Sequence, residues 1–218
     1  MIILENIEAV VYDLDGTIID TNALHVDSLN HVGKELGFKI TADQYSPLKG
    51  LSSTKTLEAL LPPAKYSHIP EAVKMRSKYL MEHVGEVEIL GHFREAYDQL
   101  ATRFAVAVCT SARQEFVDRV LESVPTLRVL AGKIICKERF KEGKPSAEPL
   151  RVTLKHLGGL NADQAVYIGD AHADYGSAMN AGMDFFYFRD SSSLDDQRIP
   201  QHIPRLYNHL ELLPYVIP

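Results

Sequence analysis

Short hydrophobic runs recur along the chain, and segments with helical spacing lie between them. The runs that favour β-strands cover residues 9–12, 104–109, 133–136, 165–168 and 185–188. Several are almost continuously hydrophobic, which is typical of strands buried on both faces of a sheet. The helical patterns cover residues 114–122, 148–157 and 175–181. Strands that alternate with helices predict an α/β fold built on a doubly wound parallel sheet.

One interval is too long for this alternation. Asp13 and Thr110 lie 97 positions apart, whereas a single βαβ unit needs about 30 residues. The excess contains no strand-like run. Its patterns favour helices over residues 24–36, 54–61 and 70–84, with prolines as breakers. We therefore predict an α/β core of residues 1–19 and 91–218 with an inserted helical cap domain of residues 20–90. Residues 190–218 receive no functional assignment.

Composition narrows the class of protein. The chain has 218 residues, 23 basic and 29 acidic, and a formal net charge of −6, so we expect no nucleic acid as a partner. No stretch approaches the roughly 18 apolar residues of a membrane span, and the N-terminus lacks a signal-peptide pattern. We expect a cytoplasmic protein without a membrane partner, and nothing in the sequence indicates its oligomeric state. Cys109 and Cys136 lie in apolar runs and predict two buried thiols rather than a disulfide.

Two acidic residues follow the first predicted strand. Asp13 and Asp15 come directly after residues 9–12, and ligands of open α/β sheets bind beyond the carboxyl ends of the strands. A calcium-binding loop would need a glutamate at its twelfth position, where this chain has Leu24. That alternative is excluded, and an ordinary turn at the end of a strand remains the competing interpretation.

Further polar residues follow the other predicted strands. Asp170 and Asp174 come after residues 165–168, and paired acids at such a turn are costly unless a cation joins them. Thr110 and Ser111 follow residues 104–109, and Lys144 lies in a later loop. Thr110 could be a simple turn hydroxyl, or Ser111 could take its role. Lys144 could be a solvated loop lysine.

Taken in order, these motifs resemble those of the haloacid dehalogenase superfamily of phosphatases and phosphomutases. The similarity is to its members with a helical cap, such as phosphoglycolate phosphatase and β-phosphoglucomutase. The segment from Asp13 to Thr17 resembles the first motif, and Thr110 and Lys144 fall on the second and third. Gly169 and Asp170, with Asp174, fall on the fourth. Each motif alone is short, but all four occur in order with an insertion in the expected gap.

The resemblance implies roles that fit the chemistry of these side chains. Asp13 is expected to attack phosphorus and form an aspartyl-phosphate. Asp15 is expected to act as general acid and then general base, with a pKa raised by a neighbouring carboxylate. Thr110 would hydrogen-bond a phosphoryl oxygen, and Lys144 would neutralise developing charge.

The charges of this set predict a metal ion. With Asp15 protonated, the remaining acids, Lys144 and a phosphate dianion leave a net charge of −4. A hard divalent ion, Mg²⁺, would reduce this charge. By resemblance its ligands are the carboxylate of Asp13, the backbone carbonyl of Asp15, and Asp170. Asp174 is either a ligand or a hydrogen-bond partner of Lys144, and it could also be a plain helix N-terminal acid.

The cap is expected to select the substrate. His25 and Arg76 each interrupt an apolar helical stripe, so each either points at the site or is satisfied within the cap. Lys49 could reach a substrate anion or be an exposed lysine. β-Phosphoglucomutase relatives commonly have an arginine where this chain has Ser53, which weakens a mutase interpretation. Gly16 and Ser111 complete the candidate substrate-binding residues.

We therefore expect a Mg²⁺-dependent phosphatase that acts on a small phosphorylated metabolite, such as phosphoglycolate or a sugar phosphate. A phosphosugar mutase is the alternative within the family. A catalytically silent binding or regulatory module on the same fold is the alternative from another class. A binding module, however, has no need of both Asp13 and Asp15.

Overall fold

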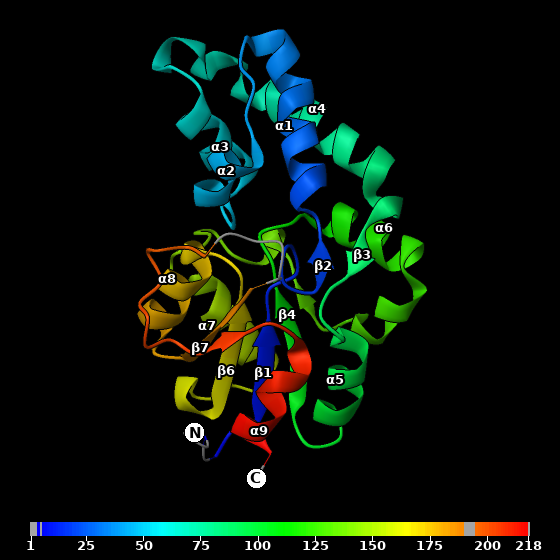
Figure 1. The fold of residues 1–218 in the computed structure, drawn as a ribbon, viewed down its shortest axis with the longest axis vertical. Coiled ribbons are helices and arrows are strands. Elements are labelled where there is room, and N and C mark those ends of the chain that lie inside the picture. The colour runs from blue at the N-terminus through cyan, green and yellow to red at the C-terminus, as the bar shows by residue number, and fades with distance from the viewer. Residues whose placement is uncertain (1–3, 5, 190–194, 218) are drawn as a thin grey trace.

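The computed structural model describes residues 4, 6–189 and 195–217 (Figure 1). Its main sheet has six parallel strands in the order β5-β4-β1-β6-β7-β8. The strands are β1 (Ala9–Tyr12), β4 (Ala105–Cys109), β5 (Ile134–Ile135), β6 (Ala165–Gly169), β7 (Asp184–Phe188) and β8 (Arg205–Leu206). The predicted α/β class and parallel sheet are confirmed.

Helices cover both faces of this sheet because neighbouring side chains of each strand point to opposite sides. Val10 and Tyr12 of β1 face one hydrophobic cluster, and Ala9 and Val11 face another. The first cluster packs under α5 (Phe93–Leu100), α6 (Gln114–Ser123) and α9 (Leu213–Val216). The second packs under α7 (Glu148–His156) and α8 (His172–Ala181). The sheet is therefore doubly wound, with β1 at its centre.

A group of helices extends from one end of the sheet (Figure 1). It comprises α1 (Asn22–Leu36), α2 (Ala42–Tyr45), α3 (Ser53–Leu60) and α4 (Ile69–His83). These helices have a hydrophobic cluster of their own, which includes Leu29, Val32 and Leu57. Pro70, expected to break a helix, lies in the first turn of α4, where its missing N–H costs nothing. We refer to α1–α4 as the helical insertion.

The two connections between sheet and insertion pair with each other. β2 (Ile19–Asp20) and β3 (Glu88–Ile89) form a short antiparallel ladder, and Leu90 N–H donates to the carbonyl of Ile18. The expectation of an interval without strands is wrong here, because two-residue strands leave no hydrophobic run in the sequence. This ladder lies beside the domain boundaries predicted at residues 19/20 and 90/91, which stay a prediction.

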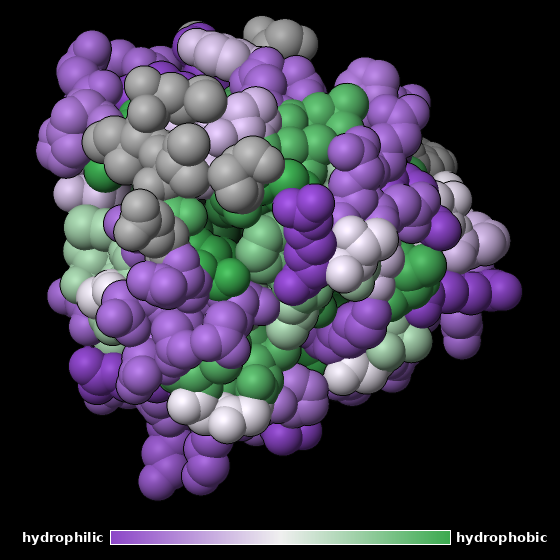
Figure 2. All heavy atoms as spheres, turned by 90° about the horizontal axis from the view of Figure 1, so that it is seen from below, coloured by the Kyte–Doolittle hydropathy of each residue, from purple (hydrophilic) through white to green (hydrophobic). Residues whose placement is uncertain are grey.

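The C-terminal part of the chain completes the sheet. β8 and α9 lie in residues 190–218, which received no functional assignment from the sequence, and residues 190–194 of that segment lie outside the described residues. Hydrophilic side chains predominate on the face opposite the helical insertion (Figure 2). Within the described ranges, no helix has both the length and the apolar character needed to cross a membrane. Cys109 and Cys136 are buried free thiols, as predicted.

Candidate active site

A cavity of about 180 Å³ lies between the sheet and the helical insertion. Its floor is formed by residues at the carboxyl ends of β1, β4 and β6, which are Asp13, Asp15, Thr110 and Asp170. Its other wall comes from the insertion and includes His25, Tyr45, Lys49, Ser53 and Arg76. The site thus lies where an open parallel sheet is expected to bind its ligand.

Lys144 is fully buried between two carboxylates. Its Nζ lies 2.6 Å from Oδ1 of Asp13 and 2.6 Å from Oδ1 of Asp174. Burial alone would lower the pKa of Lys144, but the two carboxylates raise it above its usual range. Lys144 is therefore a permanent cation beside Asp13, and the interpretation as a solvated loop lysine is wrong.

Asp174 has little capacity left for a further ligand. Oδ1 accepts hydrogen bonds from Lys144 and from the hydroxyl of Tyr167. Oδ2 accepts the backbone N–H of Ala171 at the start of α8. Asp174 therefore lies in the first turn of α8 and also binds Lys144. The alternatives of a helix N-terminal acid and of a hydrogen-bond partner of Lys144 both apply.

Three buried acids cluster at this point. Single carboxylate oxygens of Asp13, Asp170 and Asp174 lie within 4.8 Å of one another. Burial raises the pKa of Asp13 well above its usual range, and Asp174 and Asp170 add to this while Lys144 opposes it. Burial also raises the pKa of Asp170 to about 6, with Asp174 adding to the effect and Lys49 opposing it. Hard oxygen donors that repel each other in this way fit a divalent cation.

Gly16 makes this crowding possible. It has a φ of +77°, and a Cβ at this position would overlap the carboxylate of Asp170. Only glycine permits both the backbone conformation and the close approach. Gly16 therefore brings the loop after β1 against the loop after β6.

The pKa of Asp15 is lowered, whereas the sequence analysis expected it to be raised. Burial raises its pKa, but the hydrogen bond and charge of His25 and the hydroxyl of Thr21 outweigh burial, so the pKa is lowered. Oδ1 of Asp15 lies 2.9 Å from Thr21 Oγ1 and 3.2 Å from His25 Nε2. The expected raised pKa is wrong for this state, because hydrogen-bond donors rather than carboxylates surround Asp15.

The contacts of His25 fix its tautomer. Nη2 of Arg76 lies 3.1 Å from His25 Nδ1, and a guanidinium can only donate. Nδ1 must therefore accept, and Nε2 carries the proton that it donates to Asp15. Burial lowers the pKa of His25, in agreement with a neutral ring. His25 thus faces the site rather than being satisfied within an apolar stripe.

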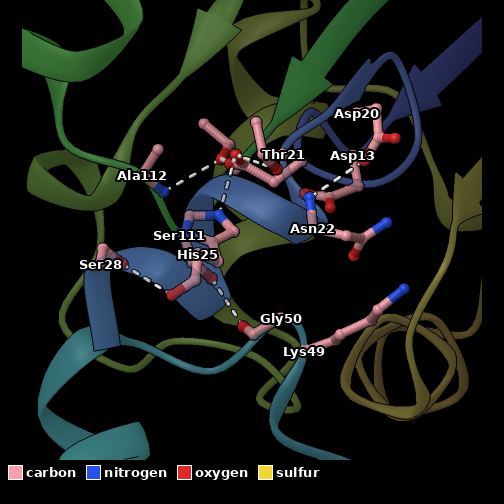
Figure 3. A network of polar contacts seen from close by, with 12 residues as sticks. Asp13, Asp20, Thr21, Asn22, His25, Ser28, Lys49, Gly50, Ser111 and Ala112 are labelled. Carbon is pink, nitrogen blue, oxygen red and sulfur yellow. Dashed lines mark hydrogen bonds and ion pairs between the residues drawn. The ribbon is translucent and has the colours of Figure 1, made fainter. Parts of the chain in front are cut away.

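Two cations on the insertion line the cavity. Arg76 is buried, and its Nη1 donates to Ser53 Oγ at 2.7 Å while its Nε donates to Ser28 Oγ at 3.2 Å. Its guanidinium therefore lies beside the serine where relatives were expected to carry an arginine. Lys49 Nζ lies 3.1 Å from Oδ2 of Asp170, so the interpretation as an exposed lysine is wrong. Figure 3 shows His25 reaching from the insertion into this network, with Lys49 extending from the loop that also carries Gly50.

The two hydroxyls after β4 point to different partners. Thr110 is buried, and its Oγ1 lies 3.5 Å from Oδ2 of Asp15 and accepts the N–H of Ala112. Ser111 Oγ instead donates to the carbonyl of Gly50 in the insertion (Figure 3). The geometry therefore favours Thr110 for contact with a reacting group and gives Ser111 a contact across the cavity mouth.

Sequence reasoning missed several residues of this network. Thr21 binds Asp15, Tyr167 binds Asp174, and Tyr45 lines the cavity. Tyr167 lies within a hydrophobic run, so no sequence signal distinguishes it from a core aromatic residue. Thr21, by contrast, lies six positions after Asp15 and three before the predicted helix of residues 24–36, and as a possible helix N-cap it could have been noticed.

Comparison with known proteins places the chain in a family. The model of the haloacid dehalogenase-like hydrolases matches residues 10–188. A phosphoglycolate phosphatase of Agrobacterium fabrum is 29% identical over 181 residues, which cover 79% of this chain and 76% of that protein. The pyrophosphatase PpaX of Bacillus velezensis is 24% identical over 188 residues, with 82% and 81% covered.

The fold comparison agrees. A crystal structure of a Lactobacillus plantarum protein superposes with a TM-score of 0.82 at 19% identity, covering 96% of this chain and 99% of that one. The similarity in fold extends over the sheet and the helical insertion alike. The chain therefore belongs to the haloacid dehalogenase-like hydrolase family, which confirms the family, and with it the hydrolase class, that the sequence predicted.

Proposed function

We propose that the chain hydrolyses a small phosphate monoester through an aspartyl-phosphate formed on Asp13. The observation that carries this proposal is the buried Asp13–Lys144–Asp174 arrangement, with Asp15 two residues further along the same loop. Lys144 holds Oδ1 of Asp13, and Oδ2 accepts no hydrogen bond within the described residues. One oxygen is thus fixed by a cation while the other remains available for attack on phosphorus.

Asp15 would transfer the proton. His25 and Thr21 occupy its Oδ1, so Oδ2, which faces Thr110, is the oxygen that remains for the leaving group. An approaching phosphate dianion raises the pKa of a nearby carboxylate, since like charges disfavour its ionised form. We propose that substrate binding itself protonates Asp15, which then acts as general acid and afterwards as general base to water.

Mg²⁺ is the proposed cofactor, with Asp13 and Asp170 as carboxylate ligands and the Asp15 carbonyl, by resemblance, as a third. When bound, the ion would offset the negative charge of the acids and polarise a phosphoryl oxygen. Asp174 would hold Lys144 rather than the ion, because both its oxygens already accept hydrogen bonds. Lys49 would have to leave Asp170 when the ion binds.

The raised pKa of Asp170 predicts a pH dependence of stability. Between pH 4 and 6, roughly, the metal-free folded protein binds more protons at Asp170 than the unfolded chain, so stability falls as pH rises. Asp170→Asn should remove this part of the slope in urea unfolding with EDTA. Mg²⁺ at pH 7.5 should raise the Tm of the wild type but not of the variant.

Asp163→Asn provides the control, because Asp163 is exposed and precedes the same strand. It should keep both the pH slope and the Mg²⁺ response. If the difference between wild type and Asp170→Asn is independent of pH, the assignment of Asp170 is wrong.

The charge of the insertion suggests a substrate with a second anionic group. Lys49 and Arg76 line this wall of the cavity, and no acidic residue of the insertion lines it among the described residues. Among the described residues, the hydrogen bonds of the buried guanidinium go to uncharged side chains, and the charge of Asp15 acts on it without a direct ion pair. A buried cation without a directly bonded carboxylate is costly unless an anion joins it. A metabolite such as 2-phosphoglycolate would supply that anion.

We expect Arg76→Gln to reduce the preference of the enzyme for substrates that carry a second anionic group. The measurement is the ratio of kcat/KM for 2-phosphoglycolate to kcat/KM for 2-hydroxyethyl phosphate, which should fall about tenfold since a charged hydrogen bond is lost. Both esters depend on Asp15 in the same way. If Arg76→Gln disturbs Asp15 through His25, both rate constants fall equally and the ratio does not change. Lys74→Gln, an exposed change on the same helix, should leave the ratio unaltered.

A phosphosugar mutase is the second candidate, favoured by the contact of Arg76 with Ser53. That contact brings a guanidinium to the position where the sequence lacks an arginine. The decisive experiment incubates purified protein and Mg²⁺ with a substrate panel, then measures inorganic phosphate and isomer formation together. Release of phosphate supports the phosphatase, isomer without phosphate supports the mutase, and inertness toward an aryl phosphate as well supports a silent binding module.

A further inference from the structure

His209 contacts both connections to the helical insertion from a distant part of the chain. It is the first residue of the 3₁₀ helix His209–Leu212 and is fully buried. Its ring Nε2 lies 3.0 Å from the carbonyl oxygen of Thr17 in the first connection. Its backbone N–H donates to the carbonyl of Gly91 in the second connection at 2.7 Å. His209 therefore binds both connections beside the β2–β3 ladder, where the two connections pair with each other.

The hydrogen bond to Thr17 needs a neutral ring with its proton on Nε2. A carbonyl can only accept, so Nε2 must donate. Nδ1 is buried and has no hydrogen-bond partner among the described residues. Burial lowers the pKa of His209 to about 3, which the Thr17 carbonyl opposes. The ring is thus held in one tautomer and makes one hydrogen bond.

Packing fixes the direction of that hydrogen bond. The ring stacks on Phe188 at a centroid distance of 4.3 Å and an interplanar angle of 6°. Tyr12 and Phe93 contact it edge-on, with centroids 5.4 Å away in each case. Gly91 has a φ of +50°, and a Cβ there would lie 3.0 Å from Phe188. The second connection therefore packs closely against Phe188, the ring on which His209 stacks, and against the backbone of Asn208.

The first connection is also the loop that carries the acids. Thr17 lies two residues after Asp15, and the N–H groups of Ile18 and Ile19 donate back to the carbonyl of Leu14. A shift of Thr17 would therefore move this tight loop, including Asp15. General acid catalysis depends on placement, and a misplacement of about 1 Å can cost about 100-fold in rate.

We propose that His209 is a positioning residue that, through Thr17, sets the place of Asp15 for proton transfer to the leaving group. The inference rests on the proposed function, because it assumes that Asp15 protonates an ester oxygen. The C-terminal segment thereby becomes part of the active-site architecture, although none of its residues in the range 195–217 lines the cavity.

The dependence of the rate on the leaving group separates this role from simple packing. An alkyl phosphate needs a proton on its leaving oxygen, whereas p-nitrophenyl phosphate has a stable leaving group and needs little help. The readout is the ratio of kcat/KM for 2-phosphoglycolate to kcat/KM for p-nitrophenyl phosphate. Loss of folded protein lowers both constants equally and leaves the ratio unchanged.

Three variants of His209 separate the contribution of the stacked ring from that of the hydrogen bond to Thr17. His209→Phe keeps the stacked ring but loses the donor, and we expect the ratio to fall at least tenfold. His209→Gln loses the ring but can place an amide N–H near the position of Nε2, so it should largely keep the ratio. In His209→Asn the side chain is too short to reach Thr17, so the ratio should fall as it does in His209→Phe. Comparison of His209→Gln with His209→Asn tests the role of the hydrogen bond even if His209→Phe does not fold.

Leu212→Ala is the matched control, since Leu212 is buried in the same short helix and is apolar. It should lose stability in urea without changing the ratio. An unchanged ratio in both His209→Phe and His209→Asn, or an equal fall in Leu212→Ala, overturns this inference and leaves the proposed function standing. A wild type that hydrolyses neither ester overturns the proposed function, and this inference with it.

Discussion

Asp13→Asn is expected to lower kcat by roughly 10⁴-fold or more, the scale seen when a covalent nucleophile is removed. The amide cannot form the acyl-phosphate, although it occupies nearly the same space as the carboxylate. The measurement is steady-state release of inorganic phosphate with Mg²⁺, together with acid quench of the wild type to trap phosphorylated enzyme. Trapped phosphate should be found on the wild type and not on the variant.

Asp27→Asn is the control for this change. Asp27 is exposed on α1, outside the cavity lining, and undergoes the same chemical substitution. It should retain wild-type turnover and wild-type trapping. Full turnover by Asp13→Asn would exclude the covalent mechanism, whatever the substrate.

Lys144→Met is expected to affect stability and activity together. Removal of this cation leaves two buried carboxylates without their partner, which typically costs about 3–5 kcal/mol in the free energy of unfolding. For a chain of this length that corresponds to a fall in Tm of roughly 10 °C. Loss of a charge stabiliser in the transition state should also reduce kcat by about 10²- to 10³-fold.

The double variant Lys144→Met/Asp174→Asn separates the two effects. Removing one unpaired carboxylate should restore part of the lost stability, as measured by urea unfolding in EDTA. Activity should remain low, because Asp13 still lacks its cation. If the double variant recovers activity along with stability, Lys144 acts only on folding.

Much of the sheet could be predicted from hydrophobic runs. The strand at residues 9–12 has the predicted bounds, and those at 104–109 and 165–168 differ from β4 and β6 by one residue. Long runs are informative because both faces of the sheet are covered. The two-residue strand β8 could not be found in this way, since it follows a proline-rich segment and is formed by pairing with β7.

Sequence reasoning identified those candidate site residues whose side-chain type alone suggests their chemistry. Asp13, Thr110, Lys144, Asp170 and Asp174 come together as the resemblance implied. The predictions for the ionisation of Asp15 and for the exposure of Lys49 were wrong, because each depends on a partner on another element. His25 lies ten positions from Asp15, and Asp170 lies 121 positions from Lys49. His209, in turn, lies 192 positions from the carbonyl that it binds.

The central position of β1 has a consequence for the order of assembly. β1 pairs with β4 and β6, whose residues lie about 95 and 155 positions later in the chain. On the ribosome β1 emerges well before both its neighbours are synthesised, and such distant pairings form slowly. The helical insertion has its own hydrophobic cluster, and all residues of that cluster are synthesised before β4. We therefore expect it to form while the nascent β1 still lacks a neighbour, so that the insertion folds before the sheet from which it extends.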